Sequence, residues 1–123
     1  MDFKRFALIL TLAATTLLAA DPAVTKAKKD LAAKNYDAAI TTLQTAAKAA
    51  PKSAEIKAAL VEALLAKADS IMYNDALPPR SKYPDALRAY RQVLPVDPNN
   101  EKAKASISTI ENIYKSMGRP VPQ

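Results

Sequence analysis

The chain has 123 residues and a formal net charge of +6, with nine prolines, a single glycine, no cysteine and no histidine. The lack of histidine and cysteine excludes Cys–His catalysis, a histidine-based serine triad and the common zinc ligand sets. No glycine-rich phosphate loop is present, and no two carboxylates stand at a spacing suited to acid–base work. The sequence therefore predicts neither an enzyme nor a cofactor or metal site.

The first twenty residues have the pattern of a targeting segment. Lys4 and Arg5 precede an uncharged run, residues 6–20, that is too short for a membrane span of about 20 residues. A basic start, a short apolar middle and small residues at the end are typical of a secretory signal peptide, here residues 1–20. Cleavage is expected between Ala20 and Asp21, and the alternative is an uncleaved N-terminal anchor. The protein is therefore expected to be exported to the periplasm or outside the cell, with only transient membrane contact through this segment.

After this segment the chain is predicted to be all-α. Apolar residues recur at helical spacing, and no stretch alternates with a period of two residues. Asp21 and Ser53 stand where helices should begin, and Gly118 stands where the last helix should end. The predicted helices run, in chain order, from about Pro22 to Asn35, Tyr36 to Ala50, Ser53 to Tyr73, Tyr83 to Pro95 and Glu101 to Met117, with Asn35 turning the chain and capping the second helix.

Two of these segments repeat each other. The first carries Tyr36, Ala39, Leu43, Ala46 and Pro51 at the same spacing as Tyr83, Ala86, Tyr90, Val93 and Pro98 in the second. Together with the turn at residues 97–100, this pattern resembles the tetratricopeptide repeat (TPR) family, in the form of a small exported protein of bacterial type. In that family each unit of about 34 residues pairs two helices. The pattern of the first helix in a pair is matched only in part, at Leu60 and Ile107.

The resemblance implies antiparallel helix pairs stacked as a short solenoid of about two and a half repeats and five helices. Residues 21–53 would form the first pair, 54–100 the second and 101–118 a closing helix, followed by a disordered tail over 119–123. The packing positions that it implies are Tyr36, Ala39, Leu43, Ala46, Pro51, Leu60, Tyr83, Ala86, Tyr90, Pro98 and Ile107. A generic amphipathic helix bundle is the alternative.

The second unit departs from the family's pattern. Tyr83 lies further from Tyr36 than the 34-residue period allows, by about 13 residues. We therefore expect the third helix to be prolonged to about Tyr73 and to be followed by an inserted loop over 74–82. Its apolar residues, which include Met72 and Tyr73, either fold back on the helix ends or form a contact site.

The resemblance implies a non-enzymatic protein–protein interaction module. The first helix of each pair would line the binding face, with Val24, Lys28, Leu31 and Ala32 from the first helix, Glu55, Ala58, Glu62 and Leu65 from the third, and Lys102, Ala105, Thr109 and Asn112 from the fifth. The alternative is a structural subunit that associates with itself through the end faces of its helix pairs, as an oligomer or filament, because about three repeats are usually needed for a stable stack.

The basic residues are spread along the chain and point to no nucleic acid. An exported protein rarely meets nucleic acid, and no aromatic residues alternate with the lysines in a stacking pattern. Most of these charges are expected to lie on solvated helix faces. The alternative is attraction to an anionic polymer or lipid headgroup of the cell envelope.

Overall fold

The computed structural model describes residues 20–123, so the predicted signal peptide lies outside the described residues except for Ala20. The described part is all-α, as predicted, and contains no strand. Its five helices are α1 (Pro22–Ala32), α2 (Tyr36–Ala49), α3 (Ala54–Met72), α4 (Pro79–Arg91) and α5 (Glu101–Ser116). Within residues 20–123, no helix is both long enough and apolar enough to cross a bilayer.

Side-chain caps fix the starts of three helices. The Asp21 carboxylate accepts a hydrogen bond of 2.8 Å from the backbone N–H of Ala23, at the start of α1. Ser53 Oγ accepts from the N–H of Ile56 at the start of α3 (3.2 Å), and Asn100 Oδ1 caps α5 in the same way. Each cap satisfies one of the N–H groups that a helix leaves without a partner in its first turn.

The connection between α1 and α2 differs from the prediction. Asn35 occupies the N-cap position of α2, but its side chain makes no capping hydrogen bond. The chain turns at Lys34 instead, which has a positive φ of 61°. The backbone N–H of Asn35 then reaches the carbonyl oxygen of Asp30 at 2.8 Å, and this bond closes the end of α1.

Replacing Lys34 by glycine is expected to stabilise the protein by about 0.5–1 kcal/mol, because a Cβ makes the left-handed conformation costly. The neighbouring Ala33→Gly is the matched control: Ala33 has a φ of −84°, so its change should destabilise the protein by a similar amount. Urea unfolding of both variants, followed by circular dichroism, measures the two effects. Equal effects of the same sign would contradict the strain at Lys34.

The loop within the insert is shorter than predicted. The third helix ends at Met72, close to the predicted Tyr73, but α4 begins at Pro79 rather than at Tyr83. Pro79 occupies the first turn, where a missing N–H costs nothing, and Pro84 lies inside the helix. The loop therefore spans residues 73–78, and residues 79–82 of the expected loop form the first turn of α4.

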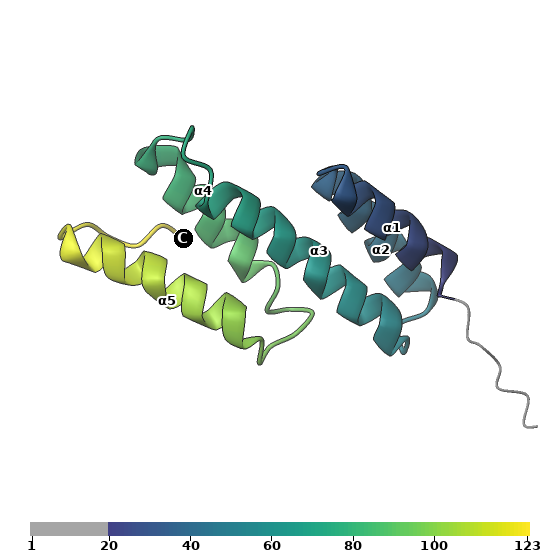
Figure 1. Cartoon of the computed structure of the whole chain (residues 1–123). Coiled ribbons are helices and arrows are strands. Elements are labelled where there is room, and N and C mark those ends of the chain that lie inside the picture. Colours follow the sequence, from purple (N-terminus) through teal and green to yellow (C-terminus); the bar gives the residue numbers. More distant parts are fainter. Residues whose placement is uncertain (1–19) are drawn as a thin grey trace, which may run out of the picture.

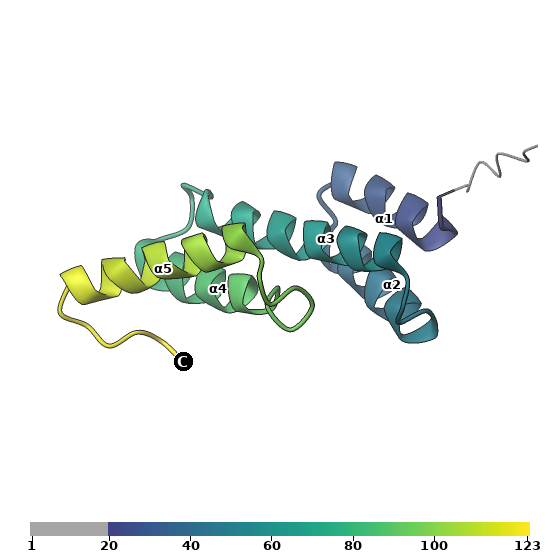
Figure 2. The ribbon, with the colours of Figure 1, turned by 90° about the horizontal axis from the view of Figure 1, so that it is seen from below.

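The helices alternate between two layers. Figure 1 shows α1, α3 and α5 side by side in one layer, with α3 in the middle. Figure 2 shows α2 and α4 in the other layer, below α3. Each helix packs against the next along the chain, and α1 also contacts α3. The long α3 thus connects the two ends of an elongated molecule.

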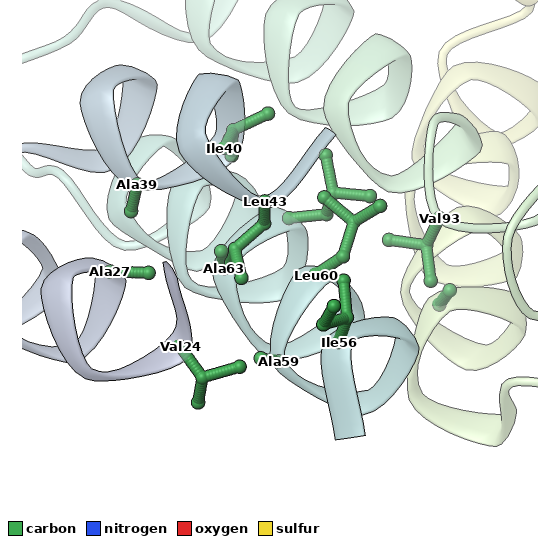
Figure 3. Packing of buried hydrophobic residues seen from close by; sticks show 12 residues of the cluster. Val24, Ala27, Ala39, Ile40, Leu43, Ile56, Ala59, Leu60, Ala63 and Val93 are labelled. Atoms are coloured by element: carbon green, nitrogen blue, oxygen red, sulfur yellow. The ribbon is translucent and has the colours of Figure 1, made fainter. Parts of the chain in front are cut away.

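The core has two parts, which lie along successive halves of α3. The first part joins α1, α2 and the beginning of α3 to Val93, which follows α4, and to Ala103 of α5, and Figure 3 shows Leu43 near Ala63 and Leu60 at its centre. The second part joins Ala68 of α3 to α4 and α5. Leu65 packs against both parts. Because much of this core is alanine, the helix axes can approach closely.

Two pairs of repeated positions are buried alike, one member of each pair in the first part of the core and the other in the second. Ala39 and Ala86 are both fully buried, and so are Leu43 and Tyr90. The other predicted packing positions are Leu60, which is buried, Tyr36, Ala46, Tyr83 and Ile107, which are half-buried, and Pro51 and Pro98, which lie in exposed turns. The correspondence does not extend to the whole repeat, because Val93 is fully buried in the first part of the core, against which its counterpart Ala46 also packs.

Residues 119–123, which were predicted to form a disordered tail, fold back on the molecule. Gly118 has a φ of 64°, and the N–H of Arg119 donates to the carbonyl oxygen of Tyr114 at 3.0 Å. Val121 then packs against the second part of the core, and Arg91 Nη1 donates to the carbonyl oxygen of Pro122 at 2.8 Å. These contacts hold the tail against α4 and α5.

Candidate interaction surfaces

Most of the residues predicted to line a partner-binding face are exposed on the layer of α1, α3 and α5. The exposed members are Lys28, Ala32, Glu55, Ala58, Glu62, Lys102, Ala105, Thr109 and Asn112. The N–H of Asp21 donates to Glu55 Oε1 at 3.1 Å, which links the start of α1 to the first turn of α3. The hydroxyl of Thr109 donates to its own helix, at the carbonyl oxygen of Ala105. This surface consists mainly of polar, charged and small side chains.

The larger apolar residues of the predicted face are less exposed than its polar and small residues. Val24 was predicted to line the face, but it is buried in the first part of the core. The reason is that α1 packs on α2 and α3 together, so its first turn is covered from two sides. Leu31 and Leu65 are half-buried and pack against the core. They contribute only their edges to the surface.

A polar network joins three helices near the middle of this layer. Tyr90 of α4 donates its hydroxyl to Asp69 Oδ1 on α3 at 2.6 Å, and Lys102 Nζ of α5 donates to Asp69 Oδ2. Both carboxylate oxygens of Asp69 are thereby used. The Lys102–Asp69 pair is partly exposed, so it contributes little by itself. The fully buried Tyr90 makes the network a fixed connection between α3, α4 and α5.

The sequence analysis missed Asp69 as a member of a site. It predicted Tyr90 as a packing residue and Lys102 as part of the exposed face, but it did not connect them. One signal was present: Asp69 follows Ala68 on the apolar side of a long helix, where an aspartate needs a partner.

Tyr90 should make the stability of the protein sensitive to high pH. Burial, and then the hydrogen bond to Asp69, raise the pKa of Tyr90 above its ordinary value, and a smaller effect of Ser106 opposes them. The folded state therefore favours the un-ionised phenol. The contribution of un-ionised Tyr90 to stability is complete below the pKa of an unfolded-state tyrosine, about 10, and is lost as the pH rises above that value.

The Tyr90→Phe variant is expected to lose about 0.5–1.5 kcal/mol at neutral pH, because Asp69 loses one hydrogen bond. Above about pH 10 the difference from the wild type should shrink, because only the wild type must keep the buried phenol at position 90 un-ionised. Urea unfolding at a series of pH values measures both effects. A constant difference across the alkaline range would contradict the role assigned to Tyr90.

Two large hydrophobic side chains are exposed near one end of the molecule. At this end α3 finishes, α4 begins and α5 finishes, on the left in Figure 1. Tyr73 is 70% exposed and Met117 is 50% exposed, and no other large hydrophobic residue of the described part is exposed. Of the two insert residues predicted to fold back or to form a contact, Met72 packs against the core and Tyr73 faces solvent.

A hollow of about 270 Å³ opens at the same end, between α4 and α5; we call it the end hollow. It is lined by Pro79, Arg80, Tyr83, Tyr114, Met117 and Arg119. Neither Arg80 nor Arg119 forms an ion pair within residues 20–123. The hollows of about 290 and 390 Å³ beside Lys67 contain ion-paired charges, such as Lys67 with Asp37, and the larger one is also lined by Lys34, which forms no ion pair within residues 20–123. The end hollow therefore combines apolar walls with free positive charge.

No group of acidic residues in the described part is arranged to hold a metal ion. The chain matches no family model, no curated protein and no solved structure.

Proposed function

We propose that this protein is a non-enzymatic protein–protein interaction module with stacked, TPR-like helix pairs. The observation that carries the proposal is the equivalent burial of Ala39 with Ala86 and of Leu43 with Tyr90 in two successive helix pairs. A stack of this kind exposes one continuous layer of helices, which is a scaffold for binding a partner. The binding face of the proposal is the exposed layer of α1, α3 and α5.

The proposal can be tested with the purified protein as bait for proteins of the cell envelope. A triple variant of the proposed face, Lys28→Glu, Glu62→Lys and Asn112→Ala, should lose a specific partner that the wild type retains. The matched control is Thr41→Lys, Thr45→Lys and Lys48→Glu, which changes exposed residues of α2 in the other layer and likewise leaves the net charge unchanged. A partner lost equally from both variants contradicts the proposed face. Retention of nothing above a scrambled control contradicts the module itself.

We further propose that the protein is exported after cleavage between Ala20 and Asp21. The described fold supports this position, because α1 begins with Asp21 as its cap and cleavage there would leave the helix whole. Mass spectrometry of the mature protein should find a chain that starts at Asp21. A mature chain that retains residues 1–20 would contradict cleavage and favour the N-terminal anchor.

A second candidate function is that of a subunit that associates with itself. The exposure of Tyr73 and Met117 near one end supports it, because their burial against a second copy would remove apolar surface from water. Light scattering across a wide concentration range tests it: the molar mass should grow with concentration. A monomer at every concentration would leave only the interaction module.

A further inference from the structure

The end of the molecule that carries Tyr73 is built by the extra residues of the second unit. The prolonged end of α3, the loop over 73–78 and the first turn of α4 have no counterpart in the first unit. Long connections in compact repeats often carry the function of the individual protein. This segment provides a projecting side chain, Tyr73, and one wall of the end hollow, at Pro79 and Arg80.

The end hollow has room for one side chain. Its volume of about 270 Å³ is smaller than the roughly 300–1,000 Å³ of sites for drug-sized ligands. Tyr83, Tyr114 and Met117 supply apolar and aromatic surface, and Arg80 and Arg119 supply positive charge. The turn at Gly118 fixes the position of the Arg119 backbone through its hydrogen bond to Tyr114. An aromatic side chain could pack against these apolar walls, and a carboxylate close to it could pair with the two arginines.

The chain itself exposes such a pair. Tyr73, with 70% of its surface exposed, stands two residues before Asp75 in the loop at the same end. Asp75 is exposed and forms no ion pair with any residue from 20 to 123. Neither residue lines the end hollow of its own chain. The chemistry that fits the hollow is therefore present on every molecule, but it lies outside that molecule's own hollow.

We propose that a second copy of this chain docks at the end hollow, with Tyr73 of one copy in the hollow of the other and Asp75 facing Arg80 and Arg119. The proposal rests on the second candidate function and gives it an interface. If each loop enters the other's hollow, the contact closes as a two-fold dimer; if only one does, it continues as a chain of copies. In either case the exposed Tyr73 becomes covered.

The test is the molar mass by light scattering at physiological ionic strength, where the repulsion from the net charge of +6 is largely screened. The full chain and a chain from Asp21, which contains the whole described core, are measured in parallel, so that association through residues 6–20 is recognised. Tyr73→Ser and Arg119→Glu should each raise the concentration of half-association at least about tenfold, equivalent to about 1.4 kcal/mol. Lys104→Glu is the control, because it makes the same charge change at an exposed site of α5 outside the hollow.

Two further experiments test the contact between Asp75 and Arg119 directly. The double charge swap Asp75→Arg with Arg119→Asp should restore association that Arg119→Glu loses, since the two charges meet across copies. Because the chain has no cysteine, a mixture of Asp75→Cys and Arg119→Cys proteins should form a linked dimer faster than Asp75→Cys with Lys104→Cys.

The results distinguish a failure of the proposed interface from a failure of the self-association on which it rests. Association that is unchanged in Tyr73→Ser and Arg119→Glu overturns this interface but leaves the self-associating subunit in place. A monomer at every concentration overturns both, and leaves the interaction module of the first proposal untouched.

Discussion

Replacing Leu43 by alanine is expected to lower the free energy of unfolding by about 2–5 kcal/mol. Leu43 is fully buried in the first part of the core, where α2 packs against both α1 and α3. Much of this part of the core is alanine, including Ala63 beside Leu43, and alanine side chains cannot move to fill the space that the shorter residue leaves. The cavity should therefore remain, and its cost adds to the lost burial.

This loss is large for a small domain, whose total stability is about 5–15 kcal/mol. The measurement is urea unfolding followed by far-ultraviolet circular dichroism. Gln44→Ala is the control, because Gln44 is the next residue of the same helix and is exposed. A loss below about 1 kcal/mol for Leu43→Ala would mean that the helices close over the site and that the first part of the core is loosely packed.

The helices and their buried sides could be predicted from the sequence because both depend on short spacings. A residue three or four positions from another lies on the same side of a helix, wherever the helix is. Ala39, Leu43, Ala86 and Tyr90 could therefore be assigned to the core before their neighbours were known. The positions of these neighbours, such as Ala63 beside Leu43, required the structure.

The start of α4 could not be predicted because the local signals conflict. Pro79 and Pro84 both suit the beginning of a helix, and a proline inside a helix normally disrupts it. The sequence analysis chose the second proline, whereas the chain uses the first. Half-buried Tyr83 packs against the second part of the core, and this tertiary contact favours a helix that already runs through residue 83.

The polar network and the end hollow were beyond prediction for a different reason. Tyr90, Asp69 and Lys102 lie on three helices, and no spacing rule relates residues so far apart in the sequence. The end hollow similarly joins the first turns of α4 to the end of α5. The 13 or so extra residues indicated where the chain is unusual, but only the packing of α4 on α5 shows what surface they build.

The small side chain at Ala39 should be as important for the stack as the large one at Leu43. Ala39 of α2 faces Ala27 of α1 in Figure 3, and both are almost fully buried. The two helices can approach this closely only because neither position carries more than a methyl group. The close approach also keeps α1 seated on α3, with which it shares the first part of the core.

Ala39→Leu is expected to destabilise the protein by about 1–3 kcal/mol, because the larger side chain must separate α1 from α2. Ala38→Leu provides a close control: it adds the same atoms to the preceding residue of the same helix, where the side chain is exposed. The control should change the stability by less than about 0.5 kcal/mol in urea unfolding. If both variants had the same small effect, the crossing of α1 and α2 would have room for a larger residue, and close packing through alanine would not be what holds the first helix pair together.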